Sequence, residues 1–161
     1  MACVRPGFRV VHYSIQKTHV HFLIEAQGKK ALASGMKSIA ARIARTVNRV
    51  FRRSGSVLDG RYHHRIMKTP REVRNGLAYV LLNSRKHFKQ SEGHAPAVRL
   101  DVGSSGWWFD GWTKRPPGTP PEQVREVATP RTWLMHTGWR RHHPRVDPAE
   151  VPGAGAGRSP V

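Results

Sequence analysis

Two short segments near the N-terminus alternate between apolar and polar residues. Residues 8–16 and residues 19–26 each follow the period of two that is typical of a β-strand. Folded as a hairpin, the two segments pair Ile15 with Val20, Tyr13 with Phe22, and Val11 with Ile24. One face is then wholly apolar, made of Val11, Tyr13, Ile15, Val20, Phe22 and Ile24. The opposite face carries His19 and His21 side by side, next to Ser14 and Gln16.

Two later segments change to the helical period of three to four residues. The first covers residues 30–53, with an apolar stripe of Leu32, Met36, Ile39, Ile43, Val47 and Val50. Thr69, Pro70 and Glu72 then form a helix start, as N-cap, first helical residue and capping-box acid. This second helix is expected to run to about His87.

The polar residues of the second helix matter for function. On a helical wheel Tyr79 and Asn83, four residues apart, share a flank of this helix rather than the side that faces the core. Between the two helices, residues 61–68 predict a short strand. Strands and helices in this order indicate an α+β domain over residues 8–88.

The rest of the chain has a different composition. Residues 89–129 are rich in Gly, Pro and Ser and predict a linker. Residues 130–151 predict a short helical segment, with the helix itself at roughly residues 131–141. Residues 152–161 are rich in Gly, Ala and Pro and are expected to be disordered.

The strongly positive net charge of the chain indicates which kind of molecule it binds. The 161 residues carry 28 Lys+Arg against 10 Asp+Glu, a net charge of +18, which favours a polyanion such as nucleic acid. The one cysteine excludes a disulfide scaffold, and no apolar stretch approaches the roughly 20 residues of a membrane span. The N-terminus has no apolar secretory segment. We therefore expect a cytoplasmic, nucleoid-associated protein with no membrane partner.

Each candidate site residue also has an ordinary interpretation. His19-Val20-His21 could hold a divalent metal between its imidazoles, or could be two solvent-facing strand residues. Tyr79 could be a boundary packing residue, and the arginines of residues 42–53 a solvated helix face. A zinc hydrolase built on the histidine pair would lack a third ligand at a familiar spacing. The conjunction of these motifs is more informative than any of them alone.

That conjunction resembles the single-tyrosine transposases of the HUH endonuclease superfamily, and among them the REP-associated tyrosine transposases. The resemblance rests on the histidine strand of residues 19–25, on Arg61-Tyr62-His63-His64-Arg65, and on Leu77-Ala78-Tyr79-Val80-Leu81-Leu82-Asn83. It covers roughly residues 8–88. Where the family usually has an Asn before the histidine pair, this chain has Thr18.

The resemblance implies a fold and a mechanism. The fold would be a ferredoxin-like antiparallel sheet with two helices. His19 and His21 would bind Mg²⁺ or Mn²⁺, with Asn83 as the third protein ligand or water-positioning residue. Tyr79 would attack a phosphate of single-stranded or hairpin DNA and form a 5′-phosphotyrosine. The DNA backbone would be contacted by Lys37, Arg42, Arg45, Arg49, Arg52, Arg53 and Arg61.

The family's fold begins with a strand and a helix before the histidine hairpin, whereas this chain begins almost at the hairpin. We therefore expect an N-terminally truncated domain, with an unpaired edge along residues 19–26 that favours homodimerisation. Truncation would lower or abolish activity. The alternative function is a non-catalytic DNA- or RNA-binding remnant of a transposase.

Overall fold

The computed structural model describes residues 4–118, 122 and 125–153. Within these residues an antiparallel sheet has the order β1–β2–β3, formed by β1 (Val4–Arg5), β2 (Phe8–Ile15) and β3 (Val20–Ala26). The helices are α1 (Gly28–Val50), α2 (Pro70–Leu81), α3 (Asn83–Glu92) and α4 (Trp139–His142). A 3₁₀ turn, η1 (Ser105–Trp108), and a π-helical turn, η2 (Leu134–Gly138), complete the list. The predicted α+β class is confirmed, while the short β1 was not predicted.

The β2–β3 hairpin has the predicted register at its closed end, where Ile15 pairs with Val20 and Ser14 with His21. Toward the open end a β-bulge at Val11 shifts the pairing, so that Val10 faces Ile24. The predicted partnership of Val11 with Ile24 is therefore wrong. A bulge adds one residue to one strand, and each side chain beyond it changes face.

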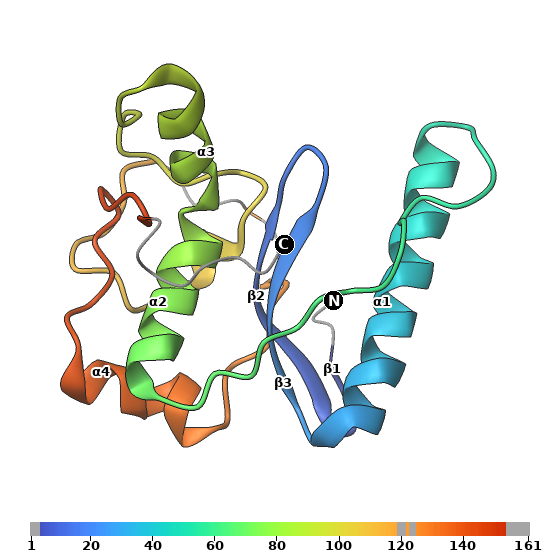
Figure 1. Cartoon of the computed structure of the whole chain (residues 1–161), viewed down its shortest axis with the longest axis horizontal. Helices are drawn as coiled ribbons and strands as arrows, with labels where there is room; N and C mark the ends of the chain where they lie inside the picture. The colour runs from blue at the N-terminus through green and yellow to red at the C-terminus, as the bar shows by residue number, and fades with distance from the viewer. Residues whose placement is uncertain (1–3, 119–121, 123–124, 154–161) are drawn as a thin grey trace.

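Each face of the sheet is covered by a different helix (Figure 1). Phe8 and Val10 pack against α1, around Ile39. Val11 and Leu23 pack instead against α2. The face that carries the histidines is thus covered by α2, although His19 itself is exposed at the end of the hairpin, and the sheet lies between two helical layers.

The start of α2 follows the predicted capping box. Thr69 Oγ1 accepts a hydrogen bond from the Glu72 backbone N–H at 3.2 Å, and the Glu72 carboxylate accepts one from the Thr69 backbone N–H at 3.2 Å. Lys68 and Arg65 also donate to this carboxylate, and these bonds lower the pKa of Glu72 to about 2. The cap fixes where α2 begins, and hence where Tyr79 lies along it.

The predicted helix of residues 70–87 is interrupted. At Leu82 the backbone leaves helical geometry, and α3 starts at Asn83 and continues to Glu92, beyond the predicted end. The predicted strand at residues 61–68 is wrong as well. This segment is extended coil that crosses the sheet without pairing with it (Figure 1), and most of its side chains are exposed. In the described sheet, β3 accordingly pairs only with β2.

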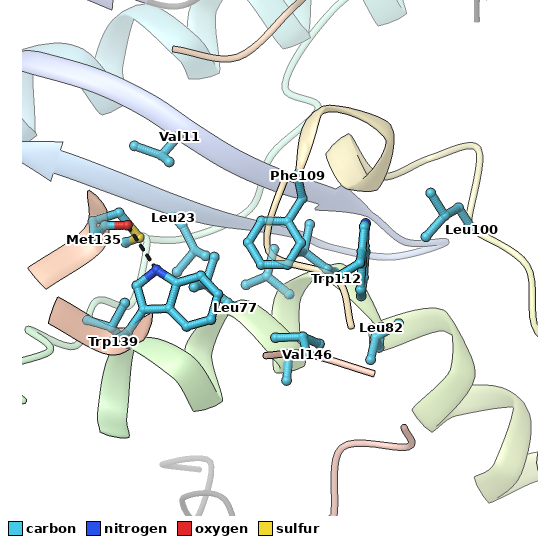
Figure 2. Packing of buried hydrophobic residues seen from close by; sticks show 14 residues of the cluster. Val11, Leu23, Leu77, Leu82, Leu100, Phe109, Trp112, Met135, Trp139 and Val146 are labelled. Carbon is cyan, nitrogen blue, oxygen red and sulfur yellow. Dashed lines mark hydrogen bonds between the residues drawn. The ribbon is translucent and has the colours of Figure 1, made fainter. Parts of the chain in front are cut away.

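Residues 89–129 do not form the predicted linker. Their first residues belong to α3, and Leu100, Phe109 and Trp112 are buried in the same core cluster as Leu77. The C-terminal segment, predicted as helical, supplies Trp139 from α4, whose indole N–H donates to the Met135 carbonyl at 3.1 Å (Figure 2). Most of the predicted disordered tail, from residue 154 on, lies outside the described residues.

Candidate active site

Three aromatic side chains meet where the end of the hairpin approaches α2. The ring centroids of His19 and His21 are 4.7 Å apart, and that of Tyr79 is 5.0 Å from that of His21. Both pairs are edge-to-face, at 74° between ring planes. His21 lies in β3, His19 directly precedes it, and Tyr79 lies in α2. The structure thus brings together three of the residues predicted from sequence.

His21 is held as a neutral imidazole at neutral pH. Burial, followed by the nearby His19, His87 and Lys86, lowers the pKa of His21 to about 4. Its Nε2 atom is buried and has no hydrogen-bond partner among the described residues. A neutral imidazole keeps one ring nitrogen with a free lone pair, so it can act as a metal ligand without first losing a proton.

Asn83 is the fourth predicted site residue, and its burial differs from the prediction. We placed it on the flank of a continuous helix, but it is fully buried, because the break at Leu82 redirects the chain at this point. Its side-chain oxygen and nitrogen both lack a hydrogen-bond partner among the described residues. Buried polar groups are nearly always satisfied by protein, water or a bound group, so this amide is a candidate ligand.

The start of α3 is anchored by a buried arginine that we did not predict to be structural. Arg85 donates to the carbonyls of Ala97 at 2.8 Å, Ala149 at 3.0 Å and Glu150 at 3.2 Å. Burial lowers the pKa of Arg85. These three bonds join α3 to two distant segments of chain, and they fix the turn that carries Asn83.

Two further basic residues reach the site and were missed from the sequence. Lys86 Nζ lies 4.9 Å from the centroid of the Tyr79 ring, and the His87 ring centroid lies 5.6 Å from that of His19. Their spacing could have revealed them, since His87 follows Asn83 by four residues, as Asn83 follows Tyr79. The site is therefore more basic than the sequence analysis suggested.

The donor set can be compared with the expected metal. No group of three or more His, Cys, Asp or Glu within the described part of the chain has an arrangement that could hold a metal ion. Two imidazoles and one amide remain as candidate ligands. His21 Nε2 and the amide atoms of Asn83 are buried and lack hydrogen-bond partners among the described residues, and imidazole and amide oxygen are both ligand types that Mn²⁺ accepts.

The predicted DNA-contacting residues are all exposed, and they lie on α1 and the loop that follows it: Lys37, Arg42, Arg45, Arg49, Arg52, Arg53 and Arg61. Because α1 covers the other face of the sheet, the structure does not place these residues against Tyr79. The C-terminal end of α1 and the turn of the hairpin do lie toward the same end of the molecule in Figure 1. A DNA strand would have to pass around that end to reach both.

Comparisons of the chain with known proteins found no match. The chain matches no protein-family model, no curated protein and no solved structure. Across the described residues, no helix combines the length and apolar character needed to cross a bilayer.

Proposed function

We propose that this protein is a metal-dependent single-strand DNA endonuclease and strand transferase, with a ferredoxin-like fold of the single-tyrosine HUH type. The observation that carries the proposal is the contact of His19 and His21, at the end of the hairpin, with Tyr79 of α2. A paired-imidazole strand beside a helix-borne tyrosine is the arrangement that such chemistry requires. The buried amide of Asn83, which has no hydrogen-bond partner among the described residues, supports the proposal as well, because buried polar groups are nearly always satisfied.

His19, His21 and Asn83 would hold Mg²⁺ or Mn²⁺. When bound, this ion would polarise the scissile phosphate and stabilise the charge that develops on it. His21 can coordinate because burial keeps it neutral. Arg85 supports the site by holding the turn of Asn83 in place.

Tyr79 would be the nucleophile. Its phenolic oxygen would form a bond to phosphorus while the bond from phosphorus to the 3′ oxygen breaks. The phenol loses its proton, and the departing 3′ oxygen gains one. The product is a 5′-phosphotyrosine and a free 3′-hydroxyl, so the bond energy is kept for transfer to a second strand. Lys86, above the Tyr79 ring, places a positive charge where the phenolate forms.

Substrate affinity would come mainly from the exposed basic residues of α1 and the following loop. With a net charge of +18, the protein would bind the DNA backbone without regard to sequence. Hairpin-bearing single-stranded DNA is the proposed substrate, and transposition or mobilisation of such repeats is the proposed role.

The test is a denaturing gel of protein incubated with labelled hairpin DNA and Mn²⁺. We expect a covalent adduct with the wild type and none with Tyr79→Phe, while DNA binding by the variant stays unchanged. Tyr62→Phe is the matched control, because Tyr62 is exposed and outside the site. An adduct of full yield in Tyr79→Phe would reject the proposal.

The second candidate is a non-catalytic DNA- or RNA-binding protein. It is favoured by the absence of a three-residue His, Cys, Asp or Glu cluster within the described residues, together with the many exposed cations. Such a protein would bind DNA with the salt dependence expected of the endonuclease. It would form no covalent adduct with DNA, whichever metal ion is added.

A further inference from the structure

A second candidate binding site lies in the C-terminal region, in the segment that the sequence analysis interpreted as a linker. A cavity of about 180 Å³ is walled by Trp107, Phe109 and Trp112, with Leu100 and Pro116 beside them. Arg115 supplies the charged group of its lining. No step of the proposed cleavage reaction uses these residues.

Two walls of this cavity, Phe109 and Trp112, are held in place by contacts within the protein. The Trp112 indole N–H donates to the Gly106 carbonyl at 3.0 Å, and the Phe109 ring meets Trp112 edge-on with centroids 5.0 Å apart. Trp107 is only partly buried, and Arg115 is exposed. Arg115 makes no hydrogen bond or ion pair with any other described residue. An aromatic slot therefore has an exposed cation at its side.

The cavity is tied to the strand that faces the histidine pair. The Ile15 backbone N–H donates to the Gly103 carbonyl at 2.7 Å, and Ser104 forms an isolated bridge with Ser14. Ser14 is the β2 partner of His21. In addition, Trp107 and Tyr79 pack against the same core cluster. A nucleic-acid strand held at Tyr79 would thus have this cavity on the same face of the sheet.

We propose that the cavity binds one unpaired nucleobase of the single-stranded DNA on which Tyr79 acts, stacked on Trp107, with its phosphate facing Arg115. Aromatic walls and a lateral cation suit a flat ring that is attached to an anion. The small volume suits a single base rather than a stacked run. This inference rests on the proposed function for the identity of the strand.

The first experiment uses the unchanged protein and a fluorescein-labelled single-stranded oligonucleotide in which one base at a time is replaced by an abasic site. Fluorescence anisotropy should show a loss of affinity on the order of 10-fold to 100-fold at one position near the cleavage site, and little loss elsewhere. A uniform profile along the strand would overturn the inference.

The second experiment assigns that position to the cavity. Trp107→Ala should bind intact DNA more weakly than the wild type by a similar factor. With the oligonucleotide that is abasic at the critical position, the variant and the wild type should bind equally well. Trp133→Ala is the matched control, since Trp133 is 53% exposed and lies outside the cavity. Equal losses in both tryptophan variants would contradict the assignment. Trp107→Phe, which keeps an aromatic face, should recover part of the affinity if the loss in Trp107→Ala does not come from misfolding.

The two proposals fail in different ways. If Tyr79→Phe still forms the adduct at full yield, or the wild type forms none, while the abasic effect persists, the base-binding cavity stands and the nuclease proposal falls. If the adduct forms but the abasic profile is flat, only the cavity proposal is overturned.

Discussion

The buried amide of Asn83 leads to a prediction that links stability to metal binding. Asn83→Leu keeps the branched shape and the number of side-chain heavy atoms but removes two polar atoms that have no partner among the described residues. Leaving such a group unsatisfied costs about 1–3 kcal/mol, so its removal should stabilise the protein. The methyl groups of leucine are slightly larger than the amide atoms, and their tighter packing should offset part of this stabilisation. We expect the metal-free variant to be more stable than the wild type by about 1–2 kcal/mol. For a chain of this size the melting temperature would rise by about 2–8 °C.

The effect of metal should be the reverse. At a Mn²⁺ concentration about 100 times its dissociation constant, a ligand that binds only the folded state stabilises the wild type by about 2.7 kcal/mol. Asn83→Leu should lose most of this increment, because two imidazoles alone hold the ion poorly.

Thermal unfolding by circular dichroism, with EDTA and with Mn²⁺, measures both effects. Ser84→Ala, at the adjacent position, is the matched control and should respond to Mn²⁺ as the wild type does. A metal-free Asn83→Leu less stable than the wild type by more than about 1 kcal/mol would refute the argument, because it would show that the amide has a partner. An undiminished Mn²⁺ shift would show that Asn83 is not a ligand.

Three further predictions concern the scaffold and the DNA surface. Burial lowers the pKa of His12 from 6.5 to about 3. As pH falls, this histidine is therefore protonated in the unfolded chain before it is protonated in the folded protein, which favours unfolding. This group alone should remove about 2 kcal/mol of unfolding free energy between about pH 8 and pH 5, and unfolding curves of His12→Asn should lack that loss. In Gly35→Ala the new Cβ would lie 2.2 Å from the Phe8 ring, so chemical denaturation should show a loss of about 1–3 kcal/mol instead of the usual helical gain. Arg45→Ala should reduce the log–log salt slope for single-stranded DNA by about 0.7, and an unchanged slope would remove Arg45 from the interface.

Much of the local structure could be predicted from sequence, because the relevant interactions are between neighbouring residues. The capping box at Thr69 depends on residues three apart, and the closed end of the hairpin depends on a short turn. The proximity of His19 and His21 on one strand face follows from the period of two alone. The position of Tyr79 on the covering helix followed from the helical wheel once the start of α2 was known.

The remaining features depend on contacts between residues far apart in sequence. The bulge at Val11 lets Val10 pack against α1 while Val11 packs against α2, and no local pattern distinguishes the two valines. The break at Leu82, which buries Asn83, is fixed by the bonds of Arg85 to residues 97, 149 and 150. The Gly- and Pro-rich composition of residues 89–129 concealed a set of buried aromatic residues, because composition alone does not indicate tertiary packing.

The most direct test of the central claim is to identify the amino acid that becomes linked to DNA. After reaction with hairpin DNA and Mn²⁺, digestion with nuclease and trypsin should leave a nucleotide attached to the peptide of residues 75–85, in which Tyr79 is the only tyrosine. Tandem mass spectrometry should locate the added phosphate on Tyr79, and the modified peptide should be missing when EDTA replaces Mn²⁺. An adduct on the peptide that contains Tyr13 or Tyr62, or no adduct under any metal condition, would contradict the account.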